Sequence, residues 1–469
     1  MPPWLRIVLI LSLLLLAISV PVLQAGYADL QQAALAATHL ERADLYLSAA
    51  RRLPWRADLY ELAGHEYYYA SEYAAADAAY QRAQRRRALS PEGWVAWGDV
   101  NYLNGDTDRA AALWKQGLEQ GIFSEDLYSR LAQTYKDQKD FAASAQYLQL
   151  YTTAHLEDAS ARYRLGLLLT LTDPNTALDE LLAASQINPE FDPATQTLRS
   201  ALNVASLTES LSMQKVIIGR GLALVGEWEL AQAAFEQALP LDESNAEAWA
   251  WLAEAQQQTA KSDAELGPAR TQAFEHLQRA VSLDPNSVVV RTLRGLYYQR
   301  IGDERSALTE LQVAVRLSPQ DPALQVSLGD SYARSGDLIA ALQAYQTAAA
   351  LTPGDVTYWR RLAQFSAANQ SHVADVGVPA AQQAVVLSKD NANDLDLLGW
   401  LLVLSGRYPE AERQLQRALA LDPQLASAHF HLGMLYLQTD QPEQARASLL
   451  RARDLGSTEA QAVLNQSFP

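Results

Sequence analysis

The chain has 469 residues, of which 49% are hydrophobic and 19% charged, so it carries enough apolar material for a folded core. Its formal net charge is −17, which argues against a nucleic-acid partner because binding to phosphates needs clustered lysines and arginines. No cysteine occurs in the sequence, and this excludes disulfides, thiol catalysis, cysteine-ligated zinc and a thioether lipid anchor.

The first segment, residues 1–27, is expected to be a membrane anchor or a signal peptide. One cation, Arg6, precedes an uncharged run over residues 7–23, and as a helix this run would extend about 25 Å, at the short end of what crosses a bilayer. Trp4 and Tyr27 flank the run as interfacial aromatic residues do, which favours an uncleaved anchor over a cleaved signal peptide. In both cases the rest of the chain is expected on the extracytoplasmic side, in a single-pass membrane protein or in a protein secreted after cleavage.

From about residue 28 onward the sequence repeats itself. Three stretches, which begin at residues 94, 324 and 426, share a Gly after a large apolar residue, an apolar or aromatic residue about three positions later, an Ala twelve positions later and a large apolar residue four positions after that. The first small residue, which we call the reference residue, lets a paired helix approach closely. It occurs eleven times, in most cases 34 residues apart: Gly64, Gly98, Ala132, Gly166, Gly219, Ala253, Gly295, Gly329, Ala363, Gly399 and Gly433.

This period and pattern resemble the tetratricopeptide repeat, whose signature contains W-x-x-L-G-x-x-Y, then A-x-x-x-F, then P. Gly295, Tyr298, Ala307, Leu311 and Pro319 form one close match. The resemblance covers nearly all of the chain after the first segment. It implies an all-α fold, a right-handed superhelical solenoid of about 11–12 stacked antiparallel helix pairs preceded by one N-terminal hydrophobic helix.

The regular spacing is interrupted, and the interruptions predict the domain organisation. Between Gly166 and Gly219 the step is 53 residues, and residues 193–211 fit one unpaired helix. We therefore expect an N-terminal repeat block over 28–190, an intervening helix over 191–212, and a C-terminal repeat block over 213–469 that ends in a capping helix. A further excess of eight residues after Ala253 is expected to form an extended loop over 257–272.

Nothing in the sequence predicts catalysis. Residues 329–333 imitate the nucleophile elbow of hydrolases, but that motif needs a strand-to-helix turn and these residues fall in the middle of a repeat helix. His429 and His431 are two positions apart, so on a helix their side chains point about 200° apart and cannot chelate one metal ion. We expect no enzymatic activity, no cofactor and no metal site.

The resemblance also implies a binding surface. In the family, the first helix of each pair lines a concave groove that receives segments of partner proteins, with inward side chains three before, one after, and four or five after the reference residue. Applied to this sequence, the rule gives a polar and aromatic set in the first repeats, Glu61, His65, Tyr68, Tyr69, Asp99, Tyr102, Gln133 and Lys136, and an apolar set in the last repeats, Trp400, Phe430 and Met434.

Both sets have a structural alternative. Each polar residue could be solvated or could contact a neighbouring repeat, and Tyr67, three after Gly64, falls on the buried position of the signature. The apolar set would form an exposed patch unless it is covered, and the C-terminal helix around Val463 and Leu464 is the expected cover.

The leading functional hypothesis is a noncatalytic protein–protein interaction scaffold or assembly adaptor. It would be membrane-tethered, would face the extracytoplasmic side and would hold segments of unidentified protein partners in its groove, without binding nucleic acid. The alternative is a cleaved, secreted protein that binds a glycan or another small ligand through the Tyr-rich N-terminal repeats.

Overall fold

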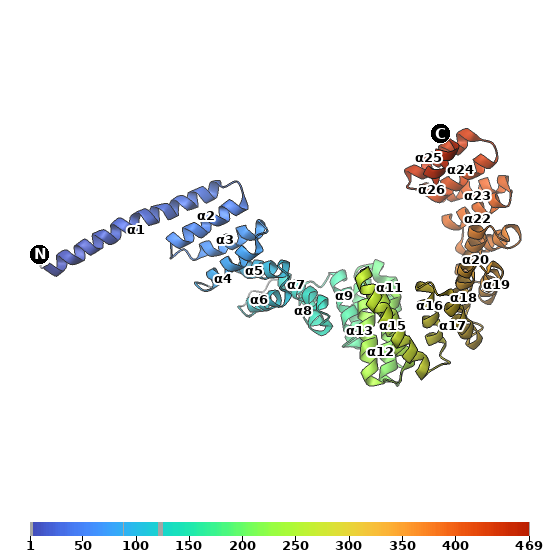
Figure 1. The fold of residues 1–469 in the computed structure, drawn as a ribbon, viewed down its shortest axis with the longest axis horizontal. Helices are drawn as coiled ribbons and strands as arrows, with labels where there is room; N and C mark the ends of the chain where they lie inside the picture. The colour runs from blue at the N-terminus through green and yellow to red at the C-terminus, as the bar shows by residue number, and fades with distance from the viewer. Residues whose placement is uncertain (1–2, 88, 121–124, 469) are drawn as a thin grey trace. The chain divides into compact units, whose positions relative to one another are not determined.

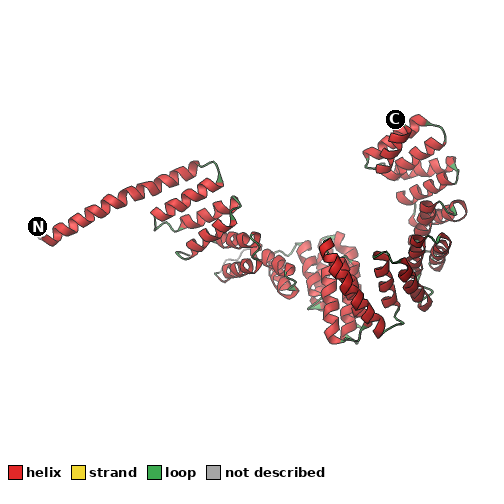
Figure 2. Cartoon of the chain, in the orientation of Figure 1, coloured by secondary structure: helices red, strands yellow, loops and turns green. Residues whose placement is uncertain are grey.

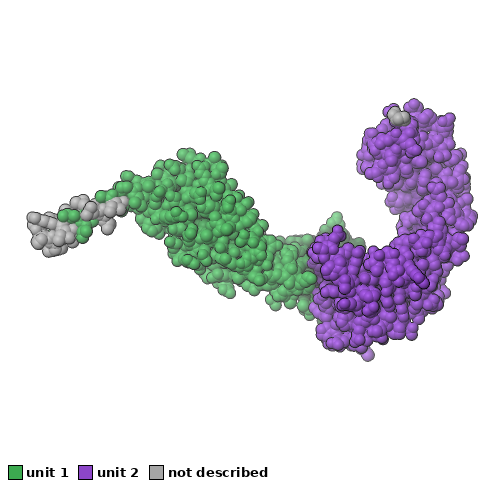
Figure 3. All heavy atoms as spheres, in the orientation of Figure 1, with its two compact units in different colours: residues 1–204 green, residues 205–469 purple. Residues whose placement is uncertain are grey.

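The protein is entirely helical over the residues that the computed structural model describes, which are 3–87, 89–120 and 125–468. Within these ranges 26 α-helices follow one another with short turns between them and without a strand (Figures 1 and 2). The chain divides into two compact units, residues 1–204 and 205–469 (Figure 3). The all-α repeat fold expected from the sequence is confirmed.

The first unit is a stack of helix pairs in which each helix packs on the next one along the chain. Its helices are α1 (Pro3–Leu35), α2 (His39–Arg52), α3 (Asp58–Tyr69), α4 (Tyr73–Gln84), α5 (Pro91–Leu103), α6 (Thr107–Glu119), α7 (Glu125–Asp137), α8 (Phe141–Ala154), α9 (Ala159–Leu169) and α10 (Pro174–Ile187), followed by a short 3-10 turn (Pro189–Phe191).

The division between the units falls within α11 (Asp192–Ser206), which occupies the segment where the sequence predicts an intervening helix. The second unit continues the same pairing, again with each helix packed on its successor. Its helices are α12 (Leu211–Leu224), α13 (Trp228–Ala238), α14 (Ala246–Thr259), α15 (Asp263–Leu283), α16 (Val288–Arg300), α17 (Glu304–Leu317), α18 (Pro322–Ser335), α19 (Leu338–Leu351), α20 (Val356–Asn369), α21 (Val378–Ser388), α22 (Ala392–Leu404), α23 (Tyr408–Leu421), α24 (Ala426–Gln438), α25 (Pro442–Asp454) and α26 (Thr458–Ser467).

The reference glycines let the two helices of a pair pack closely. A Cβ added at Gly98 would lie within 2.6 Å of Trp114 Cε2, and one added at Gly219 would lie 2.8 Å from Phe235 Cδ1. Real side chains essentially never approach so closely, so a larger residue would force the helices apart. The same pattern of small and large residues therefore builds each helix pair.

Local signals fix the turns inside the pairs. Gly105 has φ +86°, a left-handed conformation that glycine adopts without steric cost, and it ends α5. The next residue, Asp106, accepts a hydrogen bond from the backbone N–H of Arg109 and so caps α6. The same Gly-Asp sequence stands before α17, where Asp303 caps the helix, and before α19, where Asp337 does.

The N-terminal helix does not end with the predicted first segment. α1 continues to Leu35, and its second half packs on the first repeat, where Leu23 and Leu30 lie against the hydrophobic core of that repeat and Asp29 pairs with Arg52. Among the described residues, no helix combines the length and the apolar character that a membrane crossing requires. The structure thus gives no support to the transmembrane or signal-peptide assignment of residues 1–27, and the side chains of Trp4 and Arg6 lie outside the described residues.

The loop expected over residues 257–272 is wrong. α14 continues to Thr259 and α15 starts at Asp263, so the extra residues lengthen a helix of 21 residues instead of forming a loop. The pair Gly267-Pro268 signals a helix break in the sequence, but both residues lie inside α15. Ser262 accepts a hydrogen bond from the N–H of Glu265 and fixes the start of this helix ahead of the proline.

Candidate functional site

A pocket of about 230 Å³ opens in the first unit where α3, α5 and α7 meet. These are first helices of successive pairs, the helices that the resemblance assigns to the groove. The pocket is lined by Tyr68, Asp99, Tyr102, Leu103, Trp114, Arg130, Gln133 and Thr134. Four of the predicted partner-binding residues, Tyr68, Asp99, Tyr102 and Gln133, are therefore brought together around one cavity.

Aromatic rings from three helices line the pocket. Tyr68 comes from α3 and Tyr102 from α5, and the ring of Tyr102 lies 6.0 Å from that of Trp114 on α6. Trp114 is only 2% exposed and donates its indole N–H to the carbonyl of Val95 at 3.1 Å, so this ring is held in place. Burial raises the pKa of both Tyr68 and Tyr102, so their hydroxyls stay neutral near pH 7.

The polar side chains of the pocket already have partners. Arg130 binds Asp99 with two hydrogen bonds, Nε to Oδ1 at 2.7 Å and Nη2 to Oδ2 at 3.1 Å. Gln133 donates to Asp137 at 2.8 Å and accepts from Arg164 at 3.1 Å. Because these groups are satisfied within the protein, the pocket offers a preformed apolar surface with a polar rim.

One contact recurs between successive repeats. It joins the residue that directly follows a reference residue to a residue 31 positions later. That second residue stands two positions before the next reference residue. The pairs are Asp99 with Arg130, Gln133 with Arg164, Asp330 with Arg361 at 2.7 Å, and Trp400 stacked on His431 with ring centroids 4.6 Å apart. The position one after the reference residue thus joins neighbouring repeats, whereas Tyr68 and Tyr102, four after it, are the aromatic residues of the pocket.

Two of the predicted residues have structural partners. Glu61 is 4% exposed and accepts hydrogen bonds from Arg87 Nη2 at 2.6 Å and from both the backbone N–H, at 3.0 Å, and the hydroxyl of Ser90. It therefore ties α3 to the start of the next pair and presents no surface to a partner. His65 lies 2.9 Å from the hydroxyl of Tyr80, and burial lowers the pKa of its imidazole.

The other two residues of the first set lie beside the pocket. Tyr69 is 61% exposed, and its ring is 5.6 Å from that of Tyr68, so it extends the aromatic surface without lining the cavity. Lys136 is half-buried and is not among the lining residues. Tyr67 is buried and donates its hydroxyl to Asp44, and its burial raises its pKa to about 12.

The apolar set of the last repeats is partly covered by the chain itself. Phe430 packs against a cluster that includes Leu449 and Leu464, so α26 shields it in the way expected from the sequence. Trp400 packs on His431, whose Nδ1 is 2.6 Å from Asp396, and Met434 is half-buried. Phe430 is also only half-buried, and a pocket of about 420 Å³ borders it and His431 between the starts of α24 and α26.

The sequence interpretation missed four lining residues: Leu103, Trp114, Arg130 and Thr134. Trp114 occupies the large apolar position of the second helix in its repeat. A residue at this position is expected to be buried and not to line a pocket. Arg130 has no signature position of its own, and only the acid–base spacing of 31 residues from Asp99 could have identified it. No group of three or more acidic, His or Cys residues in the described ranges could hold a metal ion.

Comparisons with known proteins agree with the fold. A profile described as TPR repeat matches residues 399–440, and profiles described as tetratricopeptide repeat match 61–124, 292–356, 326–378 and 426–455. These segments are tetratricopeptide repeats and lie in both units, which supports the tetratricopeptide repeat family for this chain. No curated protein matches the chain.

Several solved structures are similar to it. Yeast Tom70 is 16% identical, with 81% of this chain and 94% of that chain covered and a TM-score of 0.33. The Cut9–Hcn1 hetero-tetramer of APC/C is 14% identical over 98% of both chains, with a TM-score of 0.37. A tetratricopeptide repeat protein from Parabacteroides merdae is 13% identical, with 55% and 99% covered and a TM-score of 0.39.

Proposed function

We propose that this protein is a noncatalytic scaffold for protein partners and that the pocket between α3, α5 and α7 is one of its docking points. Tetratricopeptide repeats support the general role in protein–protein interaction. The observation that carries the particular site is the convergence of Tyr68, Tyr102 and Trp114 on one preformed cavity. Large aromatic residues in desolvated pockets are typical of the positions that dominate binding energy in protein interfaces.

The size of the pocket favours one large apolar side chain of a partner segment. Its volume of about 230 Å³ is below the range of roughly 300–1,000 Å³ that is usual for small-molecule and cofactor sites. The saturated pair of Asp99 and Arg130 leaves little unpaired charge to attract a charged group to the centre. The hydroxyl of Tyr68 can bond to the backbone of an extended segment that runs across the rim, and that of Tyr102, which donates to Asp137 at 3.3 Å, can accept from it.

We expect Tyr102→Ala to weaken binding of apolar peptides by about 30-fold, since removal of a central aromatic residue from an interface costs on the order of 2 kcal/mol. A phage-displayed library of random dodecapeptides, selected on the full chain, provides the probe. Peptides enriched on the wild type should carry a Phe, Trp, Leu or Met and should be lost on the variant. Tyr27→Ala is the matched control, because Tyr27 is 50% exposed and lies on α1 outside the pocket. Equal binding of the apolar peptides to the Tyr102→Ala variant and the wild type would contradict the site.

We further propose that the N-terminal segment tethers the repeats to a membrane and that they face the extracytoplasmic side. Support comes from the uncharged run over residues 7–23 and from Arg6 ahead of it. Ile10 and Leu11, within this run, are 56% and 59% exposed, so these apolar side chains are left open for contact with lipid.

A sodium carbonate wash of membranes from expressing cells tests the tether. We expect the wild type to stay in the pellet and the double variant Leu14→Lys/Ile18→Lys to be released, because a charge at the centre of a spanning helix costs about 2.5–3.5 kcal/mol. Release of the wild type by the wash would exclude the anchor and would favour secretion after cleavage.

A further inference from the structure

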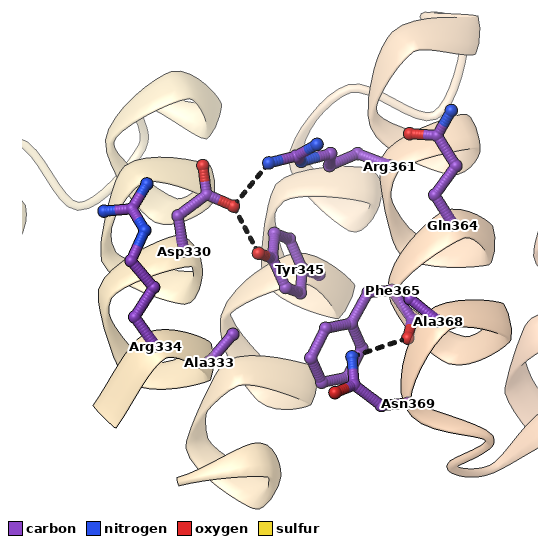
Figure 4. A pocket seen from close by; sticks show the side chains of 9 residues that line it. All are labelled: Asp330, Ala333, Arg334, Tyr345, Arg361, Gln364, Phe365, Ala368 and Asn369. Atoms are coloured by element: carbon purple, nitrogen blue, oxygen red, sulfur yellow. Dashed lines mark hydrogen bonds and ion pairs between the residues drawn. The ribbon is translucent and has the colours of Figure 1, made fainter. Parts of the chain in front are cut away.

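A second pocket, of about 300 Å³, lies in the second unit between α18, α19 and α20 (Figure 4). It is lined by Asp330, Ala333, Arg334, Tyr345, Arg361, Gln364, Phe365, Ala368 and Asn369. No residue of the predicted partner-binding sets belongs to it.

The two pockets occupy the same place in the repeat. Asp99 and Asp330 both follow a reference glycine, and Gln133 and Gln364 both follow a reference alanine. The arginines that pair with the two aspartates, Arg130 and Arg361, stand two positions before those alanines. Trp114 and Tyr345 both stand sixteen positions after the glycine. The repeat thus builds the same frame in each unit, an Asp–Arg pair over an aromatic residue of the second helix.

The chemistry inside the two frames differs. Where the first pocket has Tyr102 and Leu103, four and five after the glycine, the second has Ala333 and Arg334. The aromatic surface is therefore replaced by a cation. Arg334 is 48% exposed, and its ion pair with Glu304 is long, at 3.8 Å. The carboxylate of Glu304 is 20% exposed, but at this distance the pair is weaker than a close ion pair, so the half-exposed guanidinium can turn toward a ligand.

The Asp–Arg pair of the second pocket is also more open. Arg361 reaches Asp330 through Nη2 alone, at 2.7 Å, whereas Arg130 grips both oxygens of Asp99. Figure 4 shows Arg361 and Tyr345 directed at the same oxygen of Asp330, with the amide of Gln364 beyond Arg361. Arg361 therefore balances the charge of Asp330, and Tyr345 donates a neutral hydrogen bond to the same oxygen.

We infer that this second pocket binds an acidic side chain, Asp or Glu, from an extended segment of a protein partner. The inference adds a second docking point of different preference to the scaffold role proposed above and rests on that role. Its lining carries two arginines and one aspartate, a net positive charge in a chain whose formal net charge is −17. Arg334 would pair with the incoming carboxylate, Arg361 and the amide of Gln364 would donate to it, and Phe365 would pack against its methylene groups.

The peptide library described above also tests this site, since its peptides are fused to the phage coat protein at their C-termini and present side-chain carboxylates only. We expect a class of acidic peptides to be enriched on the wild type and to bind the Arg334→Gln variant about tenfold more weakly. The matched control is Arg316→Gln, which removes the same charge from an exposed arginine at the end of α17 and should keep acidic binding unchanged. Tyr102→Ala should keep it as well.

The outcomes separate the two proposals. Enrichment of acidic peptides alone would contradict the docking point proposed for the first pocket and support the one in the second pocket. Enrichment of apolar peptides alone would support the first pocket and contradict the second. Acidic peptides that bind the Arg334→Gln and Arg316→Gln variants equally would also overturn the second pocket, because they would then be held by general charge. Arg334 is exposed, and equal thermal unfolding of this variant and the wild type would show that a loss of binding arises at the site.

Discussion

Replacing Gly98 by alanine is expected to lower the free energy of unfolding by about 2–3 kcal/mol, a large effect for the addition of one methyl group. The new Cβ would lie within 2.6 Å of Trp114 Cε2, and Trp114 is 2% exposed. The ring cannot move aside easily because its N–H is bonded to the carbonyl of Val95. The loss from overpacking therefore exceeds the gain of up to about 1 kcal/mol in helix propensity that alanine brings.

Urea unfolding followed by tryptophan fluorescence measures this change. Gly267→Ala is the control, because Gly267 also lies inside a helix but no atom beyond its chain neighbours and its own helix backbone stands within 4 Å of the added Cβ. This control should be close to neutral, because the gain of roughly 0.5–1 kcal/mol in helix propensity is opposed by the contact of the new Cβ with the ring of Pro268. If both variants unfolded at the wild-type midpoint, the spacing between α5 and α6 would not depend on the missing side chain.

Replacing Glu61 by glutamine should cost about 2 kcal/mol of stability without removing a ligand contact. The carboxylate is 4% exposed and holds Arg87 and Ser90 at the junction between the first helix pairs. A glutamine of the same shape would turn an N–H₂ group toward one of these donors and would leave the arginine uncompensated. The expected loss stays near 2 kcal/mol because the side chain of Arg87 is 44% exposed and partly solvated.

This prediction separates a structural role from a binding role at a residue that the sequence places in the groove. The urea midpoint of Glu61→Gln should fall, while the apolar peptides of the first pocket should bind with unchanged affinity under conditions where the variant is folded. Glu72→Gln is the control, since Glu72 is exposed and its side chain does not cap α4. An unchanged urea midpoint together with weaker binding of the apolar peptides would show that Glu61 takes part in binding.

The two pockets show how a repeat protein can vary its specificity. The Asp–Arg pair that joins successive repeats fixes the distance between first helices in both units. The residues four and five after the reference glycine differ between the two pockets, Tyr102 and Leu103 in one and Ala333 and Arg334 in the other, and we propose that they set the preference of each cavity.

Much of the fold could be predicted from the sequence because its determinants are local. Gly105 and Asp106 end one helix and cap the next through contacts within a few residues, and Gly98 meets Trp114 within its own repeat. The errors arose where a local signal was outweighed by packing. Gly267-Pro268 predicts a break, but α15 starts ahead of it and runs on with Leu277 buried in the core of its pair.

The proposed binding site could be predicted from the sequence only in part. The repeat register by itself placed Tyr68 and Tyr102 on the first helices, because every repeat presents the same face. Only the tertiary structure decided which polar side chains remain available to a partner protein, because their hydrogen-bond partners come from other helices of the chain. Glu61 occupies a groove position in the repeat pattern, but in the structure Arg87 and Ser90 bind its carboxylate. Nothing in the sequence marks Arg334 as a binding residue, and only the structure shows that its ion pair with Glu304 is long, at 3.8 Å. Those partners come from neighbouring elements, which one repeat's pattern does not specify.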